Sequence, residues 1–247
     1  MSYFDPPDKT QSVAAPHRPL LHPSLPPLPA RIARLPVDAR GFPVPWFVEW
    51  LHPDGKPFAS ISDPVRPGDY PDFRVVDARK MRLAVRNRLC WVCGGPLGRH
   101  LAFVIGPMCA VNKTSGEPPS HRECALFSAT ACPFLSKPQM VRRKNDLPDE
   151  ISKPAGTMIE RNPGVTLLWY TRRHELIRDR NGYLWRLGRP FKMEWFCRGR
   201  PATREEVMGS IESGLPALQE VATKQGYGAV AELEAQTAAA LRYVPRS

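Results

Sequence analysis

Two residue pairs with the same spacing constrain this chain more than any other feature of its sequence. Cys90 and Cys93 form a Cys-x-x-Cys pair that two glycines follow directly, and His121 and Cys124 form a His-x-x-Cys pair further along. Two thiolates at this spacing can share one ion when the chain turns tightly, and glycine permits the positive φ that such a turn often uses. Cysteine and histidine are the usual ligands of structural zinc. The sequence therefore predicts one structural Zn²⁺ bound by Cys90, Cys93, His121 and Cys124.

The second pair lies where the sequence predicts the start of a helix. Ser120 can cap a helix, and Glu123 completes a Ser-x-x-Glu capping box. His121 and Cys124 would then project from the first turn on one face. The sequence thus predicts that the last two ligands come from a helix N-terminus.

Residues 89–135 resemble a treble-clef zinc finger. In this fold a knuckle, here Cys90 to Cys93, is followed by a hairpin and then by a helix that supplies the last two ligands. The hairpin is predicted at Leu101–Val104, with Cys109–Asn112 as a possible partner strand. Four protein ligands leave zinc no open coordination position, so the site is expected to be structural and not hydrolytic.

Other interpretations of the cysteines stay open. Cys90 and Cys93 could form a redox pair, although no βαβ pattern surrounds them. Cys132 could replace His121 as the fourth ligand, because it lies at the far end of the same predicted helix. Buried, reduced core cysteines are the expected state of Cys109 and Cys132.

Treble clefs also underlie the His-Asn-His nucleases, which makes an enzyme a third alternative. The nearest candidates for catalytic residues are His100 and Asn112, and the Asp-His pair usual in that family is missing. The sequence also lacks paired carboxylates, a nucleophile elbow and a phosphate-binding loop. We therefore expect a non-enzymatic protein.

The remaining sequence predicts an α+β fold: a treble-clef-like zinc module, a small antiparallel β-meander and a C-terminal helical segment. Prolines are frequent before position 72, and residues 1–36 lack hydrophobic periodicity, so this leader is expected to be disordered. The predicted regions are the Pro-rich leader (1–36), a zinc-binding α+β region (37–139), a linker (140–156), the β-meander (157–200) and C-terminal helices (201–247).

Turn and capping residues place the elements of the second half. Asn181 and Gly182 favour a tight hairpin in the middle of the meander. Thr203 and Glu206 form a capping box, and Gly214 is predicted to end the helix that begins there. The four meander strands are predicted at Val165–Thr171, Glu175–Asp179, Tyr183–Leu187 and Lys192–Cys197, and the two further helices from Pro216 onward and at Ala229–Val244.

Positive charge is concentrated in the middle of the chain. The net charge of +11 arises within residues 71–200, whereas both flanking regions are neutral or acidic. Asp77–Leu89 is predicted as an amphipathic helix that Asp77 caps, with one face lined by arginines. Such a field attracts polyanions, and nucleic acid first. The candidate phosphate contacts are Arg79, Arg82, Arg86, Arg142, Arg143 and Lys144.

Three segments are similar to those of a group of bacterial and phage-borne proteins. They are Gly41–Val48, Phe103–Asn112 with Glu117–His121, and Gly199–Val207, and the similarity would extend over residues 36–245. The group brings no established activity, so the resemblance implies a bacterial or phage setting.

The leading hypothesis is a non-enzymatic, zinc-stabilised protein whose basic surface contacts nucleic acid or a nucleoprotein complex. The alternative is a protein–protein adaptor or a phage-encoded inhibitor of a host complex, which the aromatic segment 45–51 and the Pro-rich leader would suit. We expect a cytoplasmic protein with no membrane partner, because the chain lacks a secretory signal and any run of about 18 apolar residues.

Overall fold

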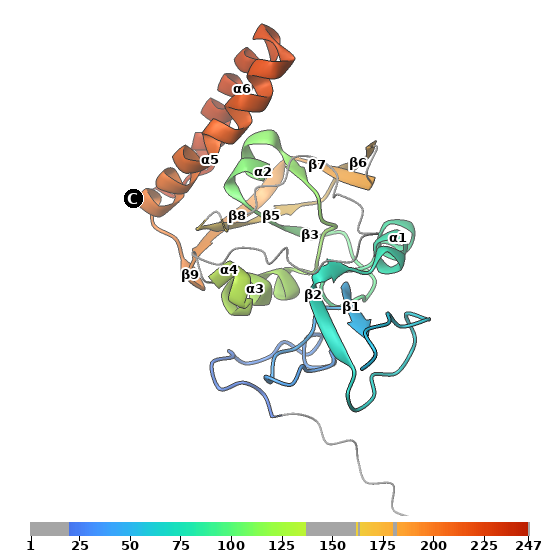
Figure 1. The fold of residues 1–247 in the computed structure, drawn as a ribbon. Coiled ribbons are helices and arrows are strands. Elements are labelled where there is room, and N and C mark those ends of the chain that lie inside the picture. Colours follow the sequence, from blue (N-terminus) through green and yellow to red (C-terminus); the bar gives the residue numbers. More distant parts are fainter. Residues whose placement is uncertain (1–19, 137–161, 163, 180–181, 247) are drawn as a thin grey trace, which may run out of the picture.

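The structure, a computed structural model, describes residues 20–136, 162, 164–179 and 182–246. It confirms the α+β class (Figure 1). In chain order the elements are β1 (Val48–Leu51), β2 (Tyr70–Val76), α1 (Ala78–Asn87), β3 (Leu101–Ile105), α2 (Pro107–Asn112), β4 (Thr114–Ser115), α3 (Arg122–Ala131), α4 (Pro133–Ser136), β5 (Thr166–Thr171), β6 (His174–Asp179), β7 (Gly182–Leu187), β8 (Pro190–Cys197), β9 (Arg200–Pro201), α5 (Arg204–Gln225), α6 (Tyr227–Ala240) and the 3₁₀ helix η1 (Leu241–Tyr243).

An antiparallel sheet with the strand order β3-β5-β8-β9 forms the centre of the fold. Every residue of β5 is buried, because helices cover both faces of this strand. Side chains alternate between the two faces, as the period of a strand requires. Leu167 and Trp169 join the larger hydrophobic core, whereas Leu168 and Tyr170 join a smaller one.

Different helices cover the two faces. Helices α2, α5 and α6 supply Met108, Val207 and Leu233 to the larger core. Helix α3 supplies Ala125 and Ala129 to the smaller core on the opposite face. The sheet therefore lies between α3 and the group of α2, α5 and α6 (Figure 1).

The β-meander prediction is correct in its strands and wrong in their order. The β6–β7 hairpin forms as expected, but it pairs with β4 in a separate sheet. Strand β5 pairs with β3 and β8 instead of β6. Strand β3 belongs to the predicted zinc-binding region, so this region and the predicted meander contribute strands to the same sheet. The predicted linker at 140–156 lies outside the described residues.

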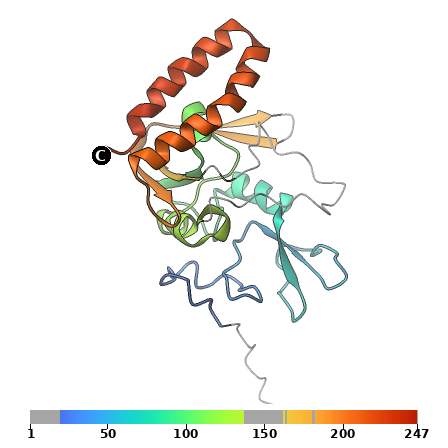
Figure 2. The ribbon, with the colours of Figure 1, turned by 60° about the vertical axis from the view of Figure 1, so that its left-hand side comes forward.

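The C-terminal helices form a long antiparallel pair (Figure 2). The capping box at Thr203 and Glu206 is confirmed. The predicted break is wrong, because α5 continues through Gly214 and Pro216 to Gln225. A Cβ at position 214 would lie 2.9 Å from the Met108 side chain, so glycine is required here for close packing of α5 on α2 and not for a helix end.

The prediction of a disordered leader is wrong for residues 20–36. The Ile32 side chain is fully buried, and a bridge between Val37 and Pro43 follows it. Residues 1–19 lie outside the described part of the chain. The prolines make residues 20–36 irregular, but apolar side chains of this segment are still buried.

Helix α1 follows the short β1–β2 sheet. Asp77 caps it as predicted and accepts a hydrogen bond from the Arg79 backbone N–H at 2.9 Å. Its most buried side chains are Lys80 and Ala84, whereas Met81 and Val85 are only partly buried. Within the described residues, no helix has both the length and the apolar character needed to span a bilayer.

Candidate metal centre

Cys90 and Cys93 lie on a tight knuckle that directly follows α1. The Cys90 N–H donates to the Gly95 carbonyl at 2.7 Å, and the Gly94 N–H donates to the Cys90 carbonyl at 2.8 Å. Gly94 has a φ of +69°, and a Cβ there would lie 2.7 Å from the Trp46 ring. Glycine at this position therefore permits both the turn and the packing of the indole against it.

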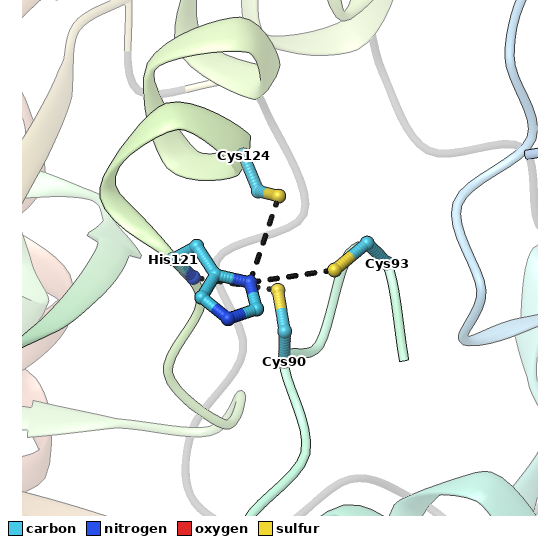
Figure 3. Close-up of side chains that lie close together, drawn as sticks. All are labelled: Cys90, Cys93, His121 and Cys124. Atoms are coloured by element: carbon cyan, nitrogen blue, oxygen red, sulfur yellow. Dashed lines mark hydrogen bonds between the residues drawn. The ribbon is translucent and has the colours of Figure 1, made fainter. Parts of the chain in front are cut away.

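His121 and Cys124 come from the start of α3 (Figure 3). His121 is the N-cap residue, and Cys124 lies in the first turn. The predicted capping role of Ser120 is wrong, because its backbone pairs with Ala102 beside the central sheet. Glu123 instead forms an ion pair with Arg31 at 2.9 Å, and this contact joins α3 to the segment before β1.

The four side chains converge on one point (Figure 3). Their ligand atoms, three Sγ and one imidazole nitrogen, all lie within 4.8 Å of one another. His121 Nδ1 is 3.3 Å from Cys93 Sγ and 3.9 Å from Cys124 Sγ. Tetrahedral zinc with ordinary bond lengths would separate its ligand atoms by about 3.5–3.8 Å. We call these four residues the Cys₃His cluster; its spacing fits one metal ion.

Backbone groups orient the ligands. His121 Nε2 lies 3.0 Å from the Pro96 carbonyl oxygen, which can only accept, so Nε2 carries the hydrogen and the Nδ1 lone pair faces the sulfurs. The His121 backbone N–H donates to Cys90 Sγ at 3.3 Å, a contact that favours a thiolate. These contacts match those that support the ligands of metal sites.

The thiols also influence one another. Hydrogen bonds from Cys124 and Cys93 lower the pKa of the Cys90 thiol far below its ordinary value. The hydrogen bond between Cys124 and Cys90 raises the pKa of the Cys124 thiol, so Cys124 keeps its proton beside the Cys90 thiolate. A divalent cation would displace the retained proton and offset most of the negative charge of the thiolates.

Apolar side chains from distant parts of the sequence shield the cluster. Cys90 and Cys124 are fully buried and pack with Ile32, Leu35 and Val92. This shield was not among the features predicted from the sequence. Leu28, Ile32 and Leu35 recur at spacings of four and three between the prolines, so the expectation that residues 1–36 lack hydrophobic periodicity is wrong for this stretch.

The segment between the two ligand pairs differs from the predicted hairpin. Leu101–Val104 is a strand as expected, but Cys109–Asn112 belongs to helix α2. Strand β3 pairs with β5 on one side and makes a single bridge from Ala102 to Ser120 on the other. The knuckle and the ligand-bearing helix thus agree with the treble-clef resemblance, while the treble-clef assignment stays a prediction.

The alternative ligands lie elsewhere. Cys132 is the C-cap residue of α3, at the end opposite to the cluster, and Cys109 lies within α2. All six cysteines are free thiols, so no disulfide joins Cys90 to Cys93. Neither nuclease candidate belongs to the cluster: His100 precedes β3 and Asn112 ends α2. Among the described residues, the Cys₃His cluster is the one group of three or more His, Cys, Asp or Glu close enough to hold an ion.

The predicted phosphate contacts have different environments. The Arg79 guanidinium forms two hydrogen bonds with Asp77 and donates to the carbonyl oxygens of Phe58 and Ala59 at 2.7 and 2.9 Å. The N–H groups of the Arg79 guanidinium are therefore engaged in hydrogen bonds within the protein. Arg82 and Arg86 are exposed on α1, while Arg142, Arg143 and Lys144 lie outside the described residues.

Comparison of the chain with protein-family models, curated proteins and solved structures found no match. The similarity to bacterial and phage-borne proteins therefore stays a prediction.

Proposed function

We propose that this chain is a zinc-stabilised, non-enzymatic binding protein whose basic surface contacts nucleic acid or a nucleoprotein complex. The observation that carries the metal assignment is the convergence of three sulfurs and one oriented imidazole within 4.8 Å. Thiolate-rich tetrahedral sets select zinc over hard cations such as Mg²⁺ and Ca²⁺. Four protein ligands leave no position for a substrate, which supports a structural role.

The position of the cluster explains how a metal ion would stabilise the fold. Three parts of the chain meet there: the knuckle after α1, the start of α3 and the residues around Ile32. None of these parts pairs with another through a continuous β-ladder. One ion bound to both ligand pairs would hold these parts together. Because structural zinc sites form only in folded protein, the binding free energy of the ion adds directly to folding stability.

Charge supports nucleic acid as the partner. The net charge is +11 and is concentrated in residues 71–200, which include α1 and the strands β3 to β8. Arg82 and Arg86 are exposed, so they are available to phosphates, whereas Arg79 is engaged internally. Lys and Arg contacts to phosphate bring affinity through counterion release without reading sequence.

A protein–protein adaptor is the second candidate, and the surface of β2 favours it. Tyr70, Phe73 and Val76 on this strand are all exposed, and Ile61 and Val65 of the preceding loop are exposed as well. Exposed apolar side chains gathered on one element are typical of protein-binding surfaces.

Two measurements test the proposal. Metal analysis of protein purified without chelator should find about one zinc per chain, and much less than that would contradict the metal assignment. The zinc-loaded protein should bind DNA or RNA at low salt, with an affinity that falls steeply as salt rises. Absence of binding at low salt would contradict the nucleic-acid function and favour the adaptor.

A further inference from the structure

An exposed phenylalanine occupies a β-bulge at one end of the central sheet. In the β5–β8 pairing, Tyr170 lies opposite Lys192, but Thr171 lies opposite Pro190, so Phe191 is an extra residue without a partner on β5. Bulges of this kind redirect a side chain and often occur beside functional sites. The Phe191 side chain is 47% exposed, although an apolar core lies beneath the same strand.

Aromatic and cationic side chains surround the Phe191 ring. Its centroid is 5.3 Å from that of His100 and 6.3 Å from that of Tyr170. The Arg172 guanidinium carbon lies 5.0 Å from the Phe191 centroid, and Lys192 Nζ lies 5.8 Å from the Tyr170 centroid. We call Phe191, Tyr170, His100, Arg172 and Lys192 the Phe191 platform.

The same end of the sheet carries further positive charge. Leu101, at the start of β3, pairs with Thr171, at the end of β5, which in turn pairs with Pro190. The chain segments next to these residues therefore lie together. They contribute the exposed residues Arg99, Arg173 and Arg189. Glu194, also on β8, forms an ion pair with Lys192 at 2.8 Å.

We propose that the Phe191 platform binds single-stranded nucleic acid, with one base stacked on the Phe191 ring and neighbouring phosphates on Arg172 and the adjacent arginines. This inference rests on the proposed nucleic-acid function and names its site and substrate class. An exposed ring among cationic side chains is the combination that single-strand-binding proteins use, because every base has a π-face and every linkage has a charge.

The geometry favours a single strand over a duplex. A base in a duplex is stacked on both sides, so its face cannot reach a side chain on a sheet surface, whereas an unpaired base can lie directly on the ring. The platform also differs from α1, the surface predicted from the sequence. One of the three predicted arginines of α1 is engaged internally, whereas the arginines beside Phe191 are exposed.

The test is fluorescence anisotropy of the zinc-loaded, full-length protein with labelled oligonucleotides of about 20 nucleotides, a length that exceeds the usual site size. The probes are single-stranded DNA, single-stranded RNA and a DNA duplex of the same sequence. Phe191→Ala should raise the Kd for single strands by about 10-fold, and Phe191→Trp should restore binding. Arg172→Ala should reduce the salt slope on single strands by about 0.7. The ratio of the Kd for single-stranded DNA to the Kd for single-stranded RNA shows which of the two the protein prefers.

Phe73→Ala is the matched control. Phe73 is also 47% exposed, and the Arg40 guanidinium carbon lies 5.4 Å from its centroid, but it belongs to β2 and not to the platform. This variant should change the Kd less than twofold, a limit close to the experimental error. If the wild type binds but Phe191→Ala has no more effect than Phe73→Ala, or if the duplex binds as tightly as single strands, the platform is overturned while the nucleic-acid function stands. If the wild type binds none of the probes at low salt, the nucleic-acid function itself fails.

Discussion

The Nε2–H of His121 donates to the carbonyl oxygen of Pro96 across 3.0 Å, and this contact decides which ring nitrogen faces the three sulfurs. Pro96 ends the knuckle that carries Cys90 and Cys93, and it forms a bridge with Leu89 on the other side of the turn. The knuckle thus orients the imidazole that completes the cluster. Each ligand pair is positioned partly by the other, so the cluster should form and fail as one unit.

Loss of one ligand should therefore remove the metal. Cys124→Ser replaces a fully buried sulfur, and the purified variant should hold less than about a tenth of an equivalent of zinc and unfold at much lower denaturant concentration. Cys109→Ala is the control, because Cys109 lies in α2 outside the cluster, and it should retain the metal. Metal analysis with denaturant unfolding checks both variants. Retention of a full equivalent by Cys124→Ser would show that the ligand assignment is wrong.

Removal of the Ile32 side chain should destabilise the protein although it lies in the proline-rich leader. Ile32 is fully buried against the cluster, so Ile32→Ala should cost about 2–5 kcal/mol of unfolding free energy. Leu20→Ala, at a position 92% exposed, should change it by less than about 0.5 kcal/mol. Urea unfolding of the zinc-loaded variants measures both values. Equal stabilities would mean that the segment does not pack on the metal centre.

Two arginines of α1 should behave differently. Arg79 donates to Asp77 and to two carbonyl oxygens of the loop before β2, so Arg79→Ala should cost about 1–3 kcal/mol of stability. It should leave the salt slope of nucleic-acid binding unchanged. Arg86→Ala alters an exposed side chain and should cost less than about 0.5 kcal/mol. A flattened salt slope in Arg79→Ala would instead assign this guanidinium to phosphate binding.

The knuckle should not tolerate a side chain at Gly94. Because Gly94 has a φ of +69°, Gly94→Ala should cost about 1–3 kcal/mol of stability through backbone strain alone. The close contact of the new Cβ with the Trp46 ring would add to this cost. Competition with a zinc chelator should show weaker metal retention in this variant. Gly98→Ala is the control, because a Cβ there has nothing within 4 Å. Similar behaviour of the two variants would refute the packing of Trp46 on the knuckle.

Asp77 should contribute a pH-dependent part of stability. Burial opposes ionisation of this carboxyl, but hydrogen bonds from the Arg79 side chain and backbone N–H outweigh it and lower the pKa of Asp77 below its ordinary 3.8. Because the folded pKa is the lower one, the carboxylate stabilises the fold above pH 3.8, and this contribution disappears as the pH falls through the folded pKa.

The variant Asp77→Asn isolates this contribution. It keeps an oxygen that can cap α1 but removes the charge, so it should be less stable than the wild type at pH 7. The difference between the two proteins should shrink as the pH falls below about 3.8. Urea unfolding of both proteins from pH 7 to pH 3 checks this, and a difference that stays constant would contradict the assigned role of the charge.

The sequence alone was sufficient for features that depend on neighbouring residues. The two ligand pairs, the Asp77 cap, the capping box at Thr203 and the β6–β7 hairpin each require only a few consecutive positions with defined backbone preferences. Local chemistry determines these features, and the structure has them where the sequence predicts them.

Sequence reasoning failed where a distant partner decided the outcome. Ser120 is a residue type that often caps helices, but its backbone forms a β-bridge with Ala102 instead. Gly214 resembles a helix stop, but the contact with Met108 makes it a packing position inside α5. In each case the tertiary contact outweighs a local preference of about 1 kcal/mol.

The amino-acid sequence by itself determined which residues can bind a metal ion and which segments can form helices and strands. Only the tertiary structure decided that Ile32 covers the Cys₃His cluster, that Arg79 is engaged internally, and that Phe191 is turned outward among arginines. The reason is physical: ligand spacing and capping act over a few bonds, whereas burial and strand pairing depend on contacts between residues far apart in the chain, which a single sequence does not specify pair by pair.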